Sequence, residues 1–199
     1  MFRKYGLLGI LLILFVQLNY FFKIQPFANW YFPLVWAGYI LVVDALIYKL
    51  RHHSLISNKP WQFLGMIIIS SLLWWIFEFM NLGIQNWNYS DIPHMRPATA
   101  NLYGTLAFAT VLPAFFQTVE LIRTLHVFDH KKLKKKHNIT KRFLHGMMTV
   151  GIITFLLPLI FPKYFYPLVW VTFFFILDPI NYLHKQPSII KHLKDRNLT

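Results

Sequence analysis

The sequence predicts an all-α, polytopic membrane protein with six transmembrane helices. Three observations carry this prediction. Of the 199 residues, 56% are hydrophobic and only 14% are charged, whereas about a quarter of the residues in an ordinary soluble domain are charged. The apolar residues form six runs of membrane length, and the cationic residues gather in alternate connections between these runs.

Each apolar run is long enough to cross a bilayer as a helix. About 18 to 21 residues at about 1.5 Å per residue span a hydrocarbon core of about 30 Å. Helices are favoured because they satisfy their backbone polar groups within the segment. The predicted spans are residues 5–22, 30–48, 61–81, 102–122, 143–161 and 164–183.

The distribution of Lys and Arg predicts an orientation. Seventeen of the 20 lie before the first span, in the second and fourth connections, or after the last span. The other three, Lys23, Arg96 and Lys163, occupy the alternate connections one by one. Because cytoplasmic connections carry the excess of Lys and Arg, both termini are predicted to be cytoplasmic. We therefore expect a multi-pass protein of the cell's inner (plasma) membrane, with an uncleaved first helix.

The fourth connection, residues 123–142, concentrates the net charge of +13. A cationic cluster beside a membrane attracts anionic lipid headgroups, at about 1 kcal/mol per cation. We expect a topogenic loop that contacts such headgroups, and docking of a partner protein is an alternative. No aromatic residues interleave the lysines, which argues against nucleic-acid binding. The expected headgroup contacts are Lys131, Lys132, Lys134, Lys135 and Lys136.

The second and sixth spans match each other at a constant offset of 134 residues. A good helix start, with Pro in the first turn and Trp at the interface, explains the matching tetrapeptide but not the matching acid. The two spans point the same way, so the sequence predicts a partial parallel repeat of spans 1–2 and 5–6. The matching residues are Pro-Leu-Val-Trp at 33–36 and 167–170, Asp44 and Asp178, Tyr48 and Tyr182, Ser54 and Ser188, and Ile56 and Ile190.

This repeat divides a single membrane domain, residues 1–199. The first repeat unit covers about residues 5–56 and the second about residues 143–190. The middle helices, 61–122, and the basic cytoplasmic loop, 123–142, lie between them.

Carboxylates within the spans are the candidate catalytic residues, because a charge at the centre of a membrane helix costs about 2.5 to 3.5 kcal/mol. Asp44, Asp178 and Glu120 lie near the cytoplasmic ends of their spans. Tyr48 and Tyr182 follow the aspartates by four residues, on the same helical face. Such a cluster would hold a proton, a cation or a polar headgroup. The alternative is that each acid pairs with a lysine or tyrosine and fixes helix packing.

The fourth span carries a polar stripe that includes Gln117 and Glu120. Thr110 and Pro113 precede them at helical spacing, so this face is expected to contact protein or water and not lipid. Gln117 is accordingly a candidate substrate-binding residue, together with Tyr48 and Tyr182.

Glu78 is a further candidate catalytic acid, near the outer end of the third span. It shares a helical face with Trp74 and Asn81, and it would lie about 18 Å from Asp44 along the membrane normal. One compact catalytic pair from Glu78 and Asp44 is therefore not expected. The following segment, rich in Asn, Trp and Tyr, is expected to fold back over Glu78. The alternative is a structural acid that snorkels or pairs with Arg96.

The residues around Glu78 and the fourth span resemble the lycopene cyclase domain of integral membrane carotenoid cyclases. The resemblance covers about residues 74–120 and implies a shared fold or a lipid-like substrate, with Asn81, Trp87 and Tyr89 as substrate contacts. The family's acidic pair after the proline is Ala114-Phe115 in this chain, so the resemblance does not extend to the acids expected for proton-initiated cyclisation. The residues that carry it are Trp75, Glu78, Asn81, Trp87, Tyr89, Pro113, Phe115, Phe116, Gln117 and Thr118.

No metal or cofactor is expected. The chain has no cysteine, which excludes thiol catalysis, disulfides and thiolate metal sites. His126 and His130 have helical ligand spacing, but the lysines that follow would repel a dication. There is no Gly-rich phosphate loop and no nucleophile-elbow serine.

Three functions remain open from the sequence. The preferred one is a membrane-embedded enzyme that acts on an isoprenoid, carotenoid or lipid substrate through its intramembrane carboxylates. The first alternative is a non-catalytic membrane partner or assembly factor. The second is a small carrier or channel, whose polar track would have to lie between chains of a homo-oligomer because the mid-depth positions are apolar.

Overall fold

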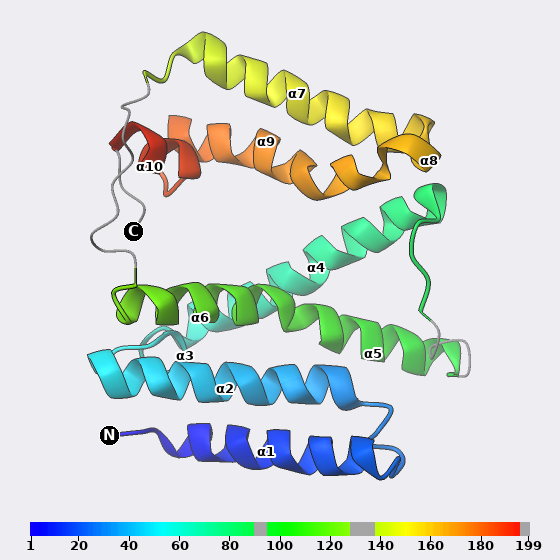
Figure 1. The fold of residues 1–199 in the computed structure, drawn as a ribbon, viewed down its shortest axis with the longest axis vertical. Helices are drawn as coiled ribbons and strands as arrows, with labels where there is room; N and C mark the ends of the chain where they lie inside the picture. Colours follow the sequence, from blue (N-terminus) through cyan, green and yellow to red (C-terminus); the bar gives the residue numbers. More distant parts are fainter. Residues whose placement is uncertain (90–94, 128–137, 196–199) are drawn as a thin grey trace. The chain divides into compact units, whose positions relative to one another are not determined.

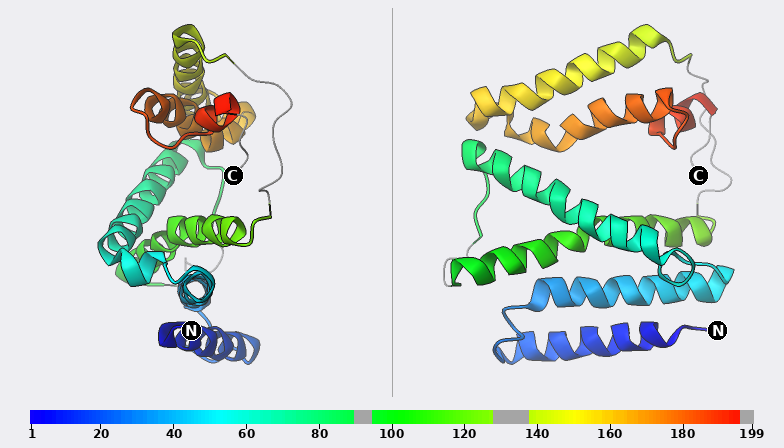
Figure 2. Two further views of the ribbon diagram at one scale, coloured as in Figure 1. Left: turned by 90° about the vertical axis from the view of Figure 1, so that its left-hand side faces the viewer. Right: turned by 180° about the vertical axis from the view of Figure 1, so that it is seen from behind.

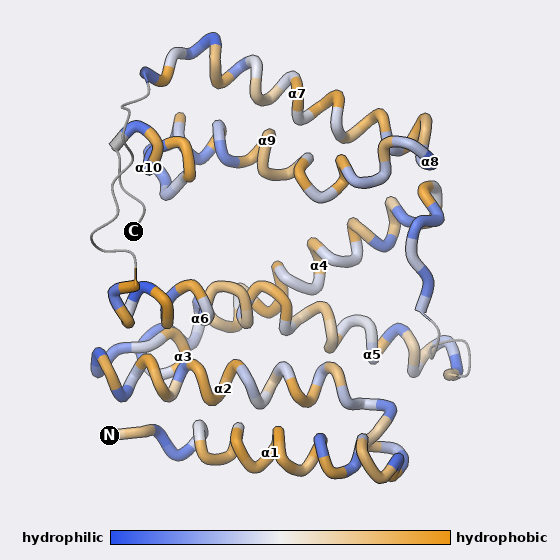
Figure 3. The backbone as a smooth tube through the Cα atoms, in the orientation of Figure 1, coloured by the Kyte–Doolittle hydropathy of each residue, from blue (hydrophilic) through white to orange (hydrophobic). Residues whose placement is uncertain are grey.

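A computed structural model describes residues 1–89, 95–127 and 138–195, and its regular structure is helical throughout these ranges. Figure 1 shows the helices, and Figure 3 shows how apolar residues dominate their middles. Six described helical segments are long and apolar enough to cross a membrane, which confirms the predicted all-α class and span count. They are Lys4–Phe21, Tyr31–Arg51, Pro60–Ile84, Pro97–Thr124, Lys141–Ile160 and Pro162–Leu183.

The chain groups into two units. Unit 1 comprises Met1–Glu78 and Tyr89–Val127, and unit 2 comprises Phe79–Asn88 and Phe128–Thr199. Each unit contains one antiparallel helical hairpin, as the views in Figures 1 and 2 show. In unit 1 the hairpin is α1 (Lys4–Phe21) with α2 (Tyr31–Arg51), and in unit 2 it is α7 (Lys141–Ile160) with α9 (Val169–Leu183).

Both hairpins pack closely at a glycine of their first helix. A Cβ added to Gly9 would lie 2.7 Å from the Gly38 carbonyl oxygen. A Cβ added to Gly151 would lie 2.5 Å from Cγ1 and 3.1 Å from the backbone nitrogen of Ile176. Small residues at such positions let helix backbones approach each other, which is how membrane helices gain packing contacts.

Four further helices complete unit 1. They are α3 (Leu55–Asn58), α4 (Pro60–Ile84), α5 (Pro97–Ala109) and α6 (Val111–Thr124). The last six residues of α4 belong to unit 2. Helix α6 packs against α2 and runs in the same direction (Figure 1). Polar pairs join α2 and α6: Tyr39 with Thr118, Asp44 with Gln117, and Arg51 with Glu120.

The predicted span 102–122 is divided into α5 and α6 at Thr110. Pro113 explains the division, because proline has no N–H to donate to the carbonyl four residues earlier, at Ala109, where α5 ends. The buried Ser70 hydroxyl of α4 lies at this break. It donates to the Phe108 carbonyl and accepts from the Leu112 N–H at 3.0 Å, so it gives a partner to one backbone acceptor and one backbone donor at the break.

Unit 2 surrounds its hairpin with short elements. The predicted span 164–183 begins in α8 (Pro162–Phe165) and the 3₁₀ helix η2 (Tyr166–Leu168), and only then continues as α9. Helix α10 (Ile189–Asp195) follows α9 after a short turn.

Candidate functional site

The Asp44 carboxylate is the centre of the most connected polar cluster in the described part of unit 1. Asp44 lies on α2 and is 0% exposed. Its Oδ2 accepts from the Tyr5 hydroxyl at 2.5 Å and the Ser54 hydroxyl at 2.7 Å. Its Oδ1 accepts from the Ile56 N–H at 2.9 Å and from Gln117 Nε2 at 2.6 Å. These five residues form the Asp44 cluster.

The Asp44 cluster explains how a carboxylate is accommodated near the end of an apolar helix. Ile56 is in the first turn of α3, where backbone N–H groups have no partner within the helix. The carboxylate supplies that partner, and the positive end of the α3 dipole favours its charge. Four hydrogen bonds occupy the lone pairs of both oxygens, so burial leaves none of them unpaired.

Asp178 makes the corresponding backbone contacts in unit 2. It is 8% exposed and accepts from the backbone N–H groups of Ile189 at 2.7 Å and Ile190 at 3.0 Å, in the first turn of α10. Ile56 and Ile190 are matched positions in the sequence. The two aspartates therefore hold the same kind of turn, but no described side chain donates to Asp178.

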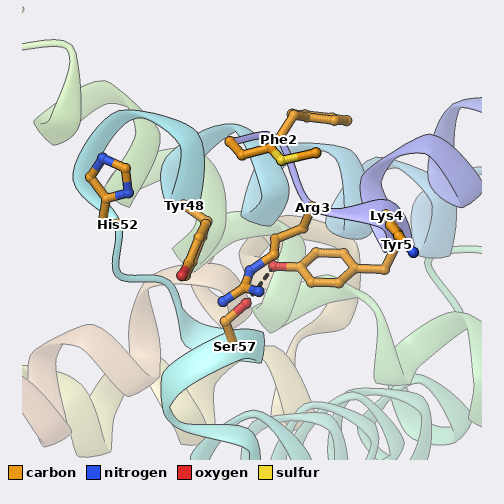
Figure 4. A pocket seen from close by; sticks show the side chains of 8 residues that line it. Phe2, Arg3, Lys4, Tyr5, Tyr48, His52 and Ser57 are labelled. Carbon is orange, nitrogen blue, oxygen red and sulfur yellow. Dashed lines mark hydrogen bonds between the residues drawn. The ribbon is translucent and has the colours of Figure 1, made fainter.

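A cavity lies next to the Asp44 cluster and shares Tyr5 with it. The Tyr5 hydroxyl also bonds the Ser57 hydroxyl at 2.8 Å, and the Arg3 guanidinium lies 3.7 Å from the centre of the Tyr48 ring (Figure 4). We call this cavity, of about 590 Å³, the α1–α3 pocket. It is lined by Met1, Phe2, Arg3, Lys4, Tyr5, Tyr48, His52 and Ser57.

The lining of the α1–α3 pocket is cationic and rich in hydroxyl groups. Arg3 and Lys4 supply charge, and Tyr5, Tyr48 and Ser57 supply three hydroxyls. No carboxylate lines the pocket, because Asp44 lies behind Tyr5. The Tyr5 O–H is donated to Asp44, so the Ser57 O–H donates to the Tyr5 oxygen. The donors left for a ligand are the Arg3 guanidinium, the Lys4 ammonium and the Tyr48 hydroxyl, which suit the oxygens of a phosphate or carboxylate.

The predicted tyrosines at four residues after each aspartate do not bond the aspartates. Tyr48 faces the Arg3 guanidinium, and the Tyr182 ring centre lies 5.8 Å from Lys194 Nζ. Each ring therefore lies near a cation of a neighbouring helix, Arg3 beside α1 for Tyr48 and Lys194 of α10 for Tyr182. Attraction between a cation and the face of an aromatic ring stabilises such a pair.

Glu120 shares no hydrogen-bond partner with Asp44 among the described residues. It pairs with Arg51, and the two side chains are 42% and 52% exposed. Arg51 also donates to the Thr124 hydroxyl at 3.5 Å. Of the polar stripe on the fourth span, Gln117 is thus the residue that reaches Asp44, and it is 2% exposed.

Glu78 accepts a hydrogen bond from the Tyr89 hydroxyl at 2.5 Å. The Asn81 side chain accepts from the Trp87 N–H at 3.3 Å and donates to the Trp87 carbonyl at 2.8 Å. Trp87 also lies against Trp170, with ring centres 5.5 Å apart. The described part of the segment after α4 therefore folds back so that Trp87 and Tyr89 bond Asn81 and Glu78, the polar residues identified in the sequence.

Two contacts of the site were not predicted from the sequence. They are the bond from Tyr5 to Asp44 and the contact of Arg3 with the Tyr48 ring, both from α1 to α2, and nothing in the local sequence indicates them. Ser54 did carry a signal, since it recurs as Ser188 in the matched segment.

The five lysines expected to contact headgroups, Lys131, Lys132, Lys134, Lys135 and Lys136, lie outside the described residues.

Comparison of the chain with protein-family models, with curated proteins and with solved structures finds no match. The similarity to the lycopene cyclase domain therefore stays a prediction from the residues alone.

Proposed function

We propose that the protein is a multi-pass protein of the inner (plasma) membrane that binds the anionic headgroup of an isoprenoid or other lipid in the α1–α3 pocket. The observation that carries the proposal is the lining of this pocket, which includes Arg3, Lys4 and the Tyr48 hydroxyl and, among the described residues, no carboxylate. Its volume of about 590 Å³ suits a headgroup, since ligand pockets commonly measure about 300 to 1,000 Å³.

The proposed orientation puts this pocket at the cytoplasmic face. The N-terminal end of α1 and the C-terminal ends of α2 and α6 lie on the same side of unit 1 (Figure 1), and they carry Arg3, Arg51 and Arg123. This supports a cytoplasmic N-terminus by the positive-inside rule. The chain has no cysteine, so single cysteines placed at Ser57 and Asn88 would report the orientation directly. An impermeant thiol reagent added to intact cells is expected to label only the cysteine at position 88.

The proposed parallel repeat has support from matched contacts. The short helix that follows each aspartate donates one backbone N–H group to Asp44 and two to Asp178. Gly9 and Gly151 each contact the matched turn of the second helix of their hairpin. We propose that α1–α2–α3 and α7–α9–α10 are two copies of one unit.

Acid–base catalysis on the bound lipid is a second candidate function. It is favoured by Tyr5, whose hydroxyl lines the pocket and also donates to Asp44 at 2.5 Å. A ligand group beside Tyr5 would give its proton to the phenol oxygen while the phenol gives its own proton to Asp44, so the ligand ends deprotonated and Asp44 ends as the carboxylic acid. Glu78, held by Tyr89, is the corresponding candidate at the opposite end of the third span.

Binding of a lipid phosphate to the purified protein tests the first proposal. Farnesyl phosphate is titrated into the detergent-solubilised protein, and binding is followed by native mass spectrometry. The paired substitution Arg3→Gln with Lys4→Gln is expected to weaken binding about tenfold or more, since each cation near a phosphate contributes about 1 kcal/mol. Lys23→Gln, at the far end of α1, is the matched control and is expected to bind as the wild type does. Equal binding by all three proteins would contradict the proposal.

Lipid-extract mass spectrometry on cells separates binding from catalysis. A strain without the gene is complemented with the wild type, Tyr5→Phe, Asp44→Asn or Glu78→Gln at matched protein levels. Catalysis through Tyr5 and Asp44 predicts that Tyr5→Phe and Asp44→Asn accumulate the same lipid as the deletion, while purified Tyr5→Phe still binds farnesyl phosphate. An unchanged lipid profile in every strain would leave binding as the function and rule out this catalysis under the growth conditions used.

A further inference from the structure

A second hollow in unit 1 shares no lining residue with the α1–α3 pocket. We call it the α4–α6 cleft. It has a volume of about 240 Å³ and is formed by the end of α2, by α3, by the first turns of α4 and by α6. Ser54 and Gln117 line it, and both donate to Asp44, so this cleft adjoins the Asp44 cluster as the α1–α3 pocket does.

The lining of the α4–α6 cleft includes two cationic side chains. Lys59 stands between α3 and α4, and Arg123 stands in the last turn of α6. The carboxylate in the lining, Glu120, has its charge compensated by Arg51. Lys59 and Arg123 therefore remain as an excess of positive charge suited to one anionic group.

Apolar side chains also line the cleft. Those of Met66 in α4 and of Phe116 and Val119 in α6 are called the apolar wall, and the Phe116 side chain is 49% exposed. An inorganic anion would gain nothing from such a wall, whereas burial of a hydrocarbon chain against it is favourable by about 0.8 kcal/mol per methylene group. The lining of the cleft thus combines two cations with an apolar wall, which matches the chemistry of an anionic amphiphile.

We propose that the α4–α6 cleft binds a membrane phospholipid with an anionic headgroup. Its phosphate lies between Lys59 and Arg123, and one acyl chain lies along Met66 and Phe116. The bound lipid lies against Ser54 and Gln117, which line the cleft and donate to Asp44. This inference rests on the membrane location of the chain and does not depend on what the α1–α3 pocket binds.

The headgroup contact is tested with phosphatidylglycerol and the detergent-solubilised full chain. Native mass spectrometry measures the affinity of the first bound lipid. Lys59→Gln with Arg123→Gln is expected to weaken it about fivefold or more. Lys49→Gln with Lys141→Gln removes two exposed cations that line neither hollow, and is expected to change it less than about twofold. Wild-type affinity in the first pair, or the same loss in both pairs, would overturn the proposal.

The acyl-chain contact gives an independent test without any change of charge. Phe116→Ala is expected to weaken phosphatidylglycerol binding about threefold or more, because Phe116 lines the cleft. Phe115→Ala is the matched control, since Phe115 is 61% exposed and does not line the cleft. Inorganic phosphate in excess is expected not to displace the lipid. Equal effects of the two substitutions, or displacement by phosphate, would show that the cleft is not a phospholipid site.

Discussion

The two hairpins hold an aspartate at the same matched position but surround it differently. In both, the carboxylate accepts from the backbone of the helix that follows. Asp44 accepts from one N–H group of α3, and Asp178 accepts from two N–H groups of α10. Asp44 also accepts from Tyr5, Ser54 and Gln117, whereas no described side chain donates to Asp178. The shared contacts are therefore those that fold the turn, and the contacts made only by Asp44 build the cluster between the two hollows of unit 1.

The difference shows how a repeated structural device can acquire a local role. Capping a helix explains why an acid is kept at both positions despite its cost in an apolar helix. It does not explain the Tyr5 hydroxyl, which lines a cavity as well as bonding the carboxylate. The candidate site therefore consists of the side-chain contacts of Asp44 that are not needed to form the turn.

The largest expected effect is a difference in stability between two alanine substitutions. Asp44→Ala leaves four buried or half-buried donors without their acceptor, and is expected to lower the free energy of unfolding by about 3 kcal/mol or more. Asp178→Ala removes a cap and is expected to cost about 1 kcal/mol. Unfolding titrations in detergent measure both values, and equal costs would show that the additional donors contribute nothing to stability.

The glycines test whether the hairpins are equivalent in packing. Gly9→Ala and Gly151→Ala both place a Cβ closer than ordinary contact to the facing helix, so each is expected to cost about 1 to 3 kcal/mol. Gly65→Ala is the control, because a Cβ there would meet nothing within 4 Å, and its effect is expected to be within about 1 kcal/mol of zero. If alanine lowered the stability in only one of the two hairpins, the two hairpins would not be equivalent in their helix packing.

The smallest expected effect concerns the Arg51–Glu120 pair. Both side chains are about half exposed, so Arg51→Gln is expected to lower stability by less than about 1 kcal/mol, and less at high salt. A double-mutant cycle with Glu120→Gln isolates the pair energy. A coupling above this range would show that the Arg51–Glu120 pair contributes substantially to holding α6 against α2, beside the Tyr39–Thr118 and Asp44–Gln117 bonds.

The spans were predictable because their signal is local and strong. A run of apolar residues long enough to cross a bilayer can be recognised without knowing what it packs against. Pro113 was visible in the sequence, but the division of the fourth span at Thr110 also needs Ser70 of α4 to satisfy the freed backbone groups. That compensation is tertiary and has no local pattern.

The candidate site was predictable only in part, for the same reason. Asp44 and Gln117 were identified because a polar residue in an apolar span is conspicuous. Their direct hydrogen bond joins residues 73 positions apart, and the bond from Tyr5 to Asp44 joins residues 39 positions apart. Ser54 was found through the repeat, while its hydroxyl bond to Asp44 depends on the chain reversing after α2. Spacing within one helix reveals a face, but not which side chains meet across helices.

The local bonds of Asp44 also set an order during synthesis. Ser54 and Ile56 follow Asp44 by 10 and 12 residues, whereas Gln117 follows it by 73. At about 5 to 20 residues per second, the ribosome delivers the first two within about one to two seconds and Gln117 only after about four to fifteen. A newly inserted first hairpin thus relies on α3 to shelter its carboxylate until two more spans have entered the membrane. Asp178, whose partners lie 11 and 12 residues on, has no such interval.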